Sequence, residues 1–195
     1  MKGIRIQGGM PLQGKVRIQG SKNAALPILA ATLLTNEVSY IQNCPRIEDV
    51  HRFVHLLREL GCMVHWQENG IRVQPGGRDD LPCDRAEARR MRGEAITGMR
   101  SSLCLLGALL GKCGYVTMEH PGGCVIGDRP IDLHIHALEQ MGVEFLEEDG
   151  LLSARAKNLH GAQITLKFPS VGATENILLA AVKATGDTVI TGAAR

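Results

Sequence analysis

Residues 97–112 read TGMRSSLCLLGALLGK, and the fold can be predicted outward from this stretch. Its long apolar run predicts a buried helix, and small polar residues precede that run at the expected start of the helix. A short β-type run, Tyr115–Met118, follows directly. The stretch therefore predicts a helix that passes straight into a strand.

The same arrangement occurs three times along the chain. Helical stretches at residues 21–35 and 171–184 carry Leu-Ala-Ala where residues 106–108 carry Leu-Gly-Ala, and a β-type run follows each of them. Counted from the leucine of each triplet, the copies are 77 and 73 residues apart. Such self-similarity at a nearly fixed period indicates an internal repeat.

In the first two copies, a second amphipathic helix and a strand pair come next. The helices are predicted over residues 47–60 and 131–141, and each stops at a glycine, Gly61 or Gly142. The strand pair turns through Asn-Gly in one copy and through Asp-Gly in the other, and both are strong hairpin signals. The predicted repeating unit is therefore βαβαββ.

The two ends of the chain fit this unit only in part. Residues 4–8 and 16–20 alternate apolar and polar side chains, which predicts two antiparallel strands before the first helix. The third copy stops at Arg195, where its second helix should begin. We therefore expect the chain to be a piece of a longer protein, incomplete in its third repeat.

The composition is that of an ordinary globular protein, with 195 residues, 44% hydrophobic and 22% charged. Aromatic residues make up 3% and the formal net charge is +2, so neither a nucleic-acid partner nor a membrane surface is expected. The chain begins without an apolar signal region, which makes the cytoplasm the expected location. Dinucleotide and P-loop glycine motifs and metal-ligand spacings are missing, so no cofactor and no metal are expected.

Six cysteines occur without CxxC spacing. Cys62, Cys104 and Cys113 lie in apolar surroundings and are expected to be inert core thiols. Cys124 differs, because it lies in the glycine-rich stretch HPGGCVIGDRP at residues 120–130. A cysteine in a cation-flanked loop is typical of a reactive thiol, although a loop cysteine of no consequence fits the residues equally well.

Three cations stand at predicted helix starts: Lys22, Arg100 and Arg129. A positive side chain is unfavourable beside the positive end of the helix dipole, so an anion held in common would explain this placement. A helix N-terminus beside an arginine is a natural seat for a phosphate or diphosphate. The alternative is that these are solvated surface charges, which is the usual fate of arginine.

With these residues assembled, the chain resembles the UDP-N-acetylglucosamine 1-carboxyvinyltransferase family, the enolpyruvyl transferases of peptidoglycan synthesis. Four segments carry the resemblance, in the order of the family: residues 20–27, 99–101, 121–134 and 170–176. The resemblance covers about the N-terminal half of a family member. It implies an inside-out α/β barrel of two domains, each built from three βαβαββ units.

The resemblance also implies domains and a reaction. Residues 1–20 would be strands of a second, mostly missing domain, and residues 21–195 an incomplete first domain. The family transfers the enolpyruvyl group of phosphoenolpyruvate to the 3-hydroxyl of UDP-N-acetylglucosamine and releases phosphate. It does so in the cytoplasm and is the target of fosfomycin. Because the family's general base and further arginines would lie beyond Arg195, the chain alone is expected to be inactive.

Carried over residue by residue, Cys124 resembles the proton donor that can form a covalent adduct with phosphoenolpyruvate and that fosfomycin alkylates. The remaining matches resemble substrate-binding residues of the family. They are Lys22, Asn23, Arg100, Arg129, Pro130, Ile131, Asp132, Leu133, Ser170, Val171 and Gly172. Phe168 departs from the family's frequent lysine, and Cys104 from a common aromatic residue.

Two alternatives remain open. The related enolpyruvyl transferase that acts on shikimate 3-phosphate shares the fold but does not use the Gly-Gly-Cys loop, so Cys124 argues against it. A truncated, non-catalytic ligand-binding domain is the other possibility, and it fits the incomplete third repeat.

Overall fold

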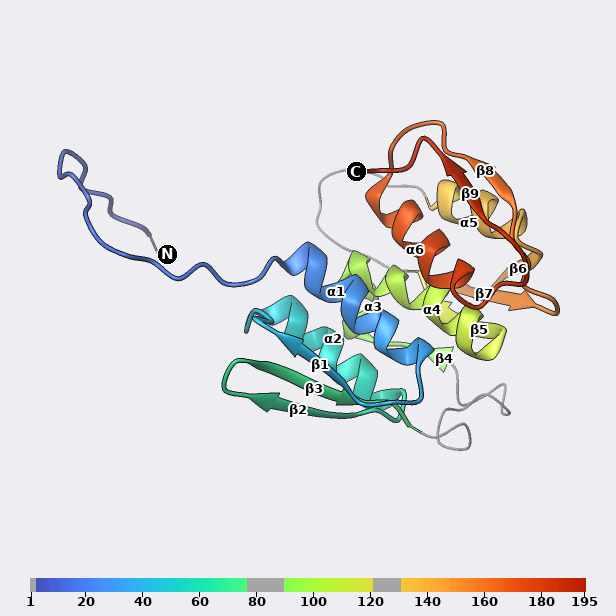
Figure 1. The fold of residues 1–195 in the computed structure, drawn as a ribbon, viewed down its shortest axis with the longest axis horizontal. Coiled ribbons are helices and arrows are strands. Elements are labelled where there is room, and N and C mark those ends of the chain that lie inside the picture. The colour runs from blue at the N-terminus through green and yellow to red at the C-terminus, as the bar shows by residue number, and fades with distance from the viewer. Residues whose placement is uncertain (1–2, 77–89, 121–130) are drawn as a thin grey trace.

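Three helices lie side by side at the centre of the fold, and small sheets flank them (Figure 1). This computed structural model describes residues 3–76, 90–120 and 131–195. The central helices are α1 (Lys22–Ala31), α4 (Cys104–Cys113) and α6 (Val171–Ala181). Each is the predicted first helix of one repeat, so the three copies meet through equivalent elements.

The other elements surround this centre. The outer helices are α2 (Glu48–Glu59) and α5 (Asp132–Glu139), and short helical turns are η1 (Thr32–Leu34), α3 (Glu94–Thr97) and η2 (Arg100–Leu103). The strands are β1 (Ser39–Gln42), β2 (Met63–Gln67), β3 (Gly70–Gln74), β4 (Arg90–Met91), β5 (Tyr115–Glu119), β6 (Val143–Glu148), β7 (Leu151–Ala156), β8 (Gln163–Thr165) and β9 (Val189–Thr191).

The sheets confirm the predicted repeat. The second copy runs β4, α4, β5, α5, β6, β7, and its sheet has the order β4-β5-β7-β6 with β4 parallel to β5. In the first copy, β1, β3 and β2 form an antiparallel sheet, and in the third copy β8 pairs parallel with β9. Both predicted helix stops are correct: Gly61 and Gly142 adopt left-handed φ values of 85° and 86°.

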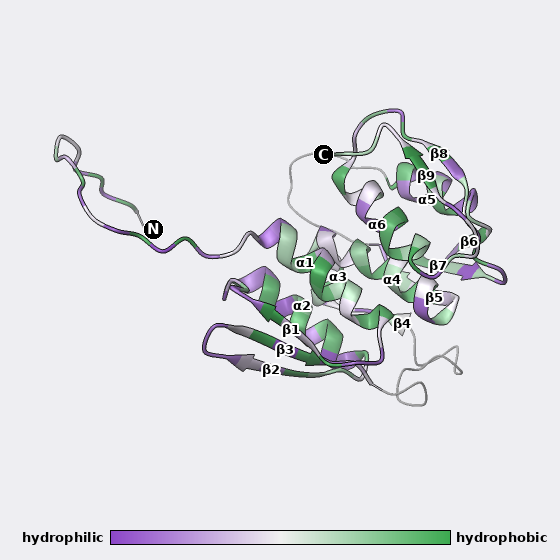
Figure 2. Cartoon of the chain, viewed as in Figure 1, coloured by the Kyte–Doolittle hydropathy of each residue, from purple (hydrophilic) through white to green (hydrophobic). Residues whose placement is uncertain are grey.

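Helix α4 is the most deeply buried element of the core. All its residues from Cys104 to Leu110 are buried, which explains why this stretch is apolar on every side (Figure 2). It packs most closely on α6, where Gly107 and Gly111 let the two backbones approach. A Cβ on Gly107 would stand 2.3 Å from the carbonyl oxygen of Asn176, and one on Gly111 would stand 3.2 Å from that of Leu179.

Two predictions about local structure are wrong. The helix predicted from Thr97 is interrupted at residues 98–99 and becomes regular α-helix only at Cys104, after the 3₁₀ turn η2. The buried Ser102 hydroxyl donates to the carbonyl oxygen of Ile96 at 3.2 Å, and this contact ties the irregular turn in place. Serine side chains commonly compete with helical backbone bonds in this way.

Residues 3–20 contain none of the predicted strands and extend away from the body of the fold (Figure 1). An isolated strand pair is at best marginally stable without a surface to cover its apolar face. The large apolar side chains of this segment are correspondingly exposed: Ile4 92%, Ile6 86%, Met10 77%, Leu12 96%, Val16 82% and Ile18 76%. Within the described parts of the chain, no helix is long and apolar enough to cross a membrane.

Candidate functional site

The three central helices run in the same direction. Gly111, near the end of α4, lies against Leu34 just beyond α1 and against Leu179 and Lys183 at the end of α6. The C-terminal ends of the three helices are therefore together, and their N-terminal ends gather on the opposite side (Figure 1). Because each helix carries a partial positive charge at its N-terminus, this side of the molecule favours an anion.

Lys22 is the first residue of α1 and lies on this side. Its Nζ forms an ion pair of 2.6 Å with Oδ2 of Asp49, which belongs to the first turn of α2. The lysine side chain remains 47% exposed, and its neighbour Asn23 is exposed as well. The lysine is therefore within reach of a ligand, and its ammonium is paired with one carboxylate. This pairing of Lys22 with Asp49 was not predicted from the sequence.

Arg100 begins η2, directly before α4, and its charge reaches the start of α5. The pKa of the buried His134 falls to about 4, because burial and the nearby positive charge of Arg100 both disfavour the imidazolium, while Asp132 acts in the opposite sense. The predicted binding residues Ile131, Asp132 and Leu133 form the N-cap and first turn of this same helix. The structure thus brings Arg100 close to the predicted segment 131–133.

The third predicted segment begins α6. Ser170 is the N-cap, and its Oγ accepts a hydrogen bond of 3.3 Å from the backbone N–H of Ala173. Val171 is exposed and Gly172 half-buried, so both are accessible at the start of the helix. Phe168, where the family often has lysine, is 59% exposed beside them. The segment offers backbone donors and a serine hydroxyl but carries no cation of its own between residues 168 and 176.

A buried contact joins the starts of α5 and α6. Nδ1 of His134 lies 2.9 Å from Nδ2 of Asn176, and the imidazole ring also packs on Gly172. The predicted segments 131–133 and 170–172 therefore lie side by side. Sequence reasoning considered His134 only as a metal ligand and did not single out Asn176, although an asparagine inside an apolar helix is itself an indication of a buried polar contact.

The cysteines divide into three groups. Cys44, Cys62 and Cys104 are buried and free, which agrees with the prediction of core thiols for Cys62 and Cys104. The Cys104 thiol donates to Oε2 of Glu175 at 3.5 Å, and its pKa is strongly raised by burial and by that carboxylate. Cys113 is disulfide-bonded, so the expectation of an inert free thiol is wrong there. Cys83, Cys124, Arg129 and Pro130 lie outside the described residues.

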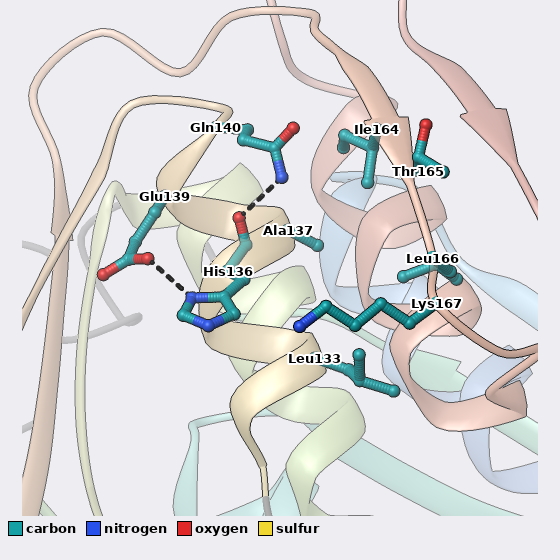
Figure 3. Close-up of a pocket in the computed structure, with 9 residues that line it drawn as sticks. All are labelled: Leu133, His136, Ala137, Glu139, Gln140, Ile164, Thr165, Leu166 and Lys167. Carbon is teal, nitrogen blue, oxygen red and sulfur yellow. Dashed lines mark hydrogen bonds and ion pairs between the residues drawn. The ribbon is translucent and has the colours of Figure 1, made fainter.

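A groove of about 510 Å³ runs between α5 and β8, next to this site (Figure 3). Lys167 extends along it toward Leu133 and His136, and His136 pairs with Glu139 at 3.2 Å. Leu133 is the one predicted site residue among those that line the groove. In the part of the chain that the structure describes, no group of three or more His, Cys, Asp or Glu side chains is arranged to hold a metal ion.

The assembled site is suited to binding a multiply charged anion. It combines the N-terminal ends of α1, α5 and α6, the exposed amine of Lys22 and the positive charge of Arg100. Backbone N–H groups at helix starts and charge-assisted bonds from lysine and arginine are the groups that bind phosphate and diphosphate. The described residues offer groups that can bind an anion, whereas the predicted acid, Cys124, belongs to the part that is not described.

Comparison with known proteins gives three results. The family model of EPSP synthase (3-phosphoshikimate 1-carboxyvinyltransferase) matches residues 6–195. Relatives named UDP-N-acetylglucosamine 1-carboxyvinyltransferase are 44% identical in Oleidesulfovibrio alaskensis and 43% identical in Lawsonia intracellularis, each aligned over 100% of this chain. The chain spans 45% of the length of each of these two relatives.

Solved structures confirm the predicted fold class. The enolpyruvyl transferase NikO from Streptomyces tendae superposes with a TM-score of 0.71 at 23% identity, over 94% of this chain and 42% of that one. EPSP synthase from Acinetobacter baumannii superposes with a TM-score of 0.62 at 20% identity, over 91% and 40%. At these identities the likeness concerns the fold, which is the inside-out α/β fold of the enolpyruvyl transferases.

Proposed function

Because the chain belongs to the EPSP synthase family, we propose that its protein transfers the enolpyruvyl group of phosphoenolpyruvate to the 3-hydroxyl of UDP-N-acetylglucosamine, releasing phosphate. The observation that carries the proposal is the convergence of Lys22, Arg100 and three helix starts on one side of the fold. The choice of acceptor is supported by the names of the relatives at 41–44% identity. The reaction would serve peptidoglycan synthesis in the cytoplasm.

The binding roles follow from charge and position. Phosphoenolpyruvate carries a phosphate and a carboxylate, and in this proposal Lys22, Arg100 and Arg129 bind these groups. Asn23 beside Lys22 contacts the sugar. The diphosphate and nucleoside lie across residues 129–133 and 170–172, where two helix starts supply backbone donors.

The proposed transfer begins with protonation of the methylene carbon of phosphoenolpyruvate, which requires an acid. We assign this role to Cys124, whose protonation of that carbon gives the substrate oxocarbenium character at the neighbouring carbon. Attack by the sugar 3-hydroxyl, whose proton passes to a general base, then forms a tetrahedral intermediate. Loss of phosphate and of a methyl proton, which reprotonates the thiolate, gives the enol ether. The assignment predicts that fosfomycin alkylates Cys124 and not the buried Cys62 or Cys104.

The domain assignment is a proposal of the same kind. Residues 1–20 are placed with a second domain and residues 21–195 with the first. The exposed apolar side chains between Ile4 and Ile18 support it, because a second domain would bury them. They follow a period of two, which is the pattern of strands with one covered face.

A second acceptor has one observation in its favour. The matching family model is described by its action on 3-phosphoshikimate, and the same anion-binding helix starts would suit a phosphorylated cyclohexene. The Gly-Gly-Cys sequence at residues 122–124 argues against it, because that loop is characteristic of the UDP-N-acetylglucosamine enzymes. A non-catalytic ligand-binding role would keep the same anion site without turnover.

Binding to the 195-residue chain tests the acceptor. We expect UDP-N-acetylglucosamine to shift the backbone amide NMR signals of residues 131–133 and 170–172, because its diphosphate lies at those helix starts. Shikimate 3-phosphate at the same concentration should shift them less because it has no diphosphate and no nucleoside, and uridine should shift them less because it lacks the charge. Shifts caused by shikimate 3-phosphate alone would replace the proposed acceptor with the second one.

A further inference from the structure

Asn176 is fully buried in the middle of α6 and holds two partners from two other helices. Its Oδ1 accepts a hydrogen bond of 2.7 Å from the backbone N–H of Gly107 in α4. Its Nδ2 lies 2.9 Å from Nδ1 of His134 in α5 and 3.4 Å from the carbonyl oxygen of Gly172. One amide group therefore joins a central helix, an outer helix and the start of α6.

These contacts fix the tautomer of His134. Because Gly107 offers an N–H, the amide oxygen of Asn176 must face it, and the amide nitrogen must face the histidine. An amide nitrogen donates only, so Nδ1 of His134 accepts and the ring proton resides on Nε2. The pKa of about 4 agrees with a ring that stays neutral near pH 7.

The His134 ring, held by Asn176, packs directly against Gly172. Its Cε1 and Nε2 would stand 3.1 Å and 3.4 Å from a Cβ placed on that residue. His134 directly follows segment 131–133, and Gly172 ends segment 170–172. The distance between the two segments is therefore set by one imidazole, whose position is set in turn by Asn176.

We propose that Asn176 is a positioning residue for the sugar-nucleotide site: through His134 it fixes the spacing of the helix starts at residues 131–133 and 170–172. This inference rests on the proposed function, since these segments are the proposed nucleotide ligands. Asn176 itself does not contact the ligand. Its loss should weaken binding of UDP-N-acetylglucosamine while the charge of Lys22, on another helix, remains in place.

Replacement of Asn176 by leucine tests the proposal. Leucine keeps the branched shape of asparagine but leaves the Gly107 N–H and His134 Nδ1 unpaired, so we expect affinity for UDP-N-acetylglucosamine to fall about tenfold or more. Thr117→Val is the matched control, because Thr117 is buried in β5 and bonds to Ser153 at 2.9 Å. The control should lose stability without losing affinity. Equal affinities of wild type and Asn176→Leu would overturn the proposal.

Asn176→Asp tests the contact with His134 separately from any general effect on stability. Its carboxylate can only accept, so it pairs with His134 only when the ring proton moves to Nδ1, and nitrogen NMR should find the ring proton there instead of on Nε2. The wild-type ring should keep its proton on Nε2, because the amide nitrogen of Asn176 donates to Nδ1; the other charged groups acting on His134, Arg100 and Asp132, are common to both proteins. A variant ring that still carries its proton on Nε2 would contradict the proposal.

Nitrogen NMR of the imidazole separates failure of this inference from failure of the proposed function. In the unliganded chain, the His134 ring should show a proton on Nε2 and none on Nδ1, and Asn176→Leu should abolish that preference. If the NMR spectra show this tautomer and its loss in Asn176→Leu, but no UDP-N-acetylglucosamine binds, the proposed function fails. The inference that Asn176 orients His134 would still hold. A wild-type ring with its proton on Nδ1 would refute the positioning contact directly.

Discussion

Replacing Gly107 with alanine should destabilise the fold by about 3 kcal/mol, although glycine to alanine inside a helix ordinarily stabilises. The new Cβ would stand 2.3 Å from the carbonyl oxygen of Asn176 and 2.9 Å from its Oδ1. Neither atom can move aside, because one is backbone and the other accepts the hydrogen bond of Gly107 itself. Helices α4 and α6 would have to separate.

Gly111→Ala on the same helix is the control. Its Cβ would meet the flexible end of Leu34 at 3.1 Å and the carbonyl oxygen of Leu179 at 3.2 Å. A shift of a few tenths of an ångström relieves these contacts, and the gain in helix propensity offsets the cost, so the net change should stay within about 1 kcal/mol. Urea unfolding of both variants measures the difference. A Gly107→Ala protein as stable as Gly111→Ala would contradict the close packing of α4 on α6.

Replacing Lys22 with methionine should lower kcat/KM for phosphoenolpyruvate about 100-fold, because a charge-assisted hydrogen bond to phosphate contributes about 2–3 kcal/mol. The fold should be unaffected, since the side chain is 47% exposed. Phosphate release measures the effect in the protein expressed from its complete gene. The far-ultraviolet circular dichroism of the variant should match that of wild type.

Asp49→Asn is the matched control for Lys22. It removes the other member of the 2.6 Å ion pair and leaves the ammonium intact. If Lys22 serves the substrate, this variant should retain kcat/KM within about threefold, because an exposed ion pair contributes little by itself. If Lys22 serves only to pair with Asp49, the two variants should behave alike, and neither should affect turnover.

Much of the fold could be predicted because short segments of sequence indicate each element of the repeat. Apolar runs, the glycines at helix ends and the Asn-Gly and Asp-Gly turns each act over a few residues, and α1, α2, α5, α6 and the hairpins follow them closely. The predicted strands at residues 4–8 and 16–20 failed for the opposite reason. The alternation of apolar and polar residues predicts strands with one buried face, and nothing in the described fold covers that face.

The site was predicted in part. The positions of Lys22, Arg100 and Ser170 at helix starts could be read from the sequence, because each precedes an apolar run. Their partners could not: Asp49 lies on another helix, and the bonds from Asn176 to Gly107 and His134 cross 69 and 42 residues of chain. Such pairs depend on how closely the helices pack. Here α4 and α6 approach closely because Gly107 has no side chain.

The central claim, enolpyruvyl transfer to UDP-N-acetylglucosamine, is tested most directly by phosphate release from phosphoenolpyruvate in the protein expressed from its complete gene. With UDP-N-acetylglucosamine as acceptor, we expect release that stops on treatment with fosfomycin and in Cys124→Ser. With shikimate 3-phosphate we expect none. Release with shikimate 3-phosphate alone, or no release with either acceptor, would contradict the proposed function.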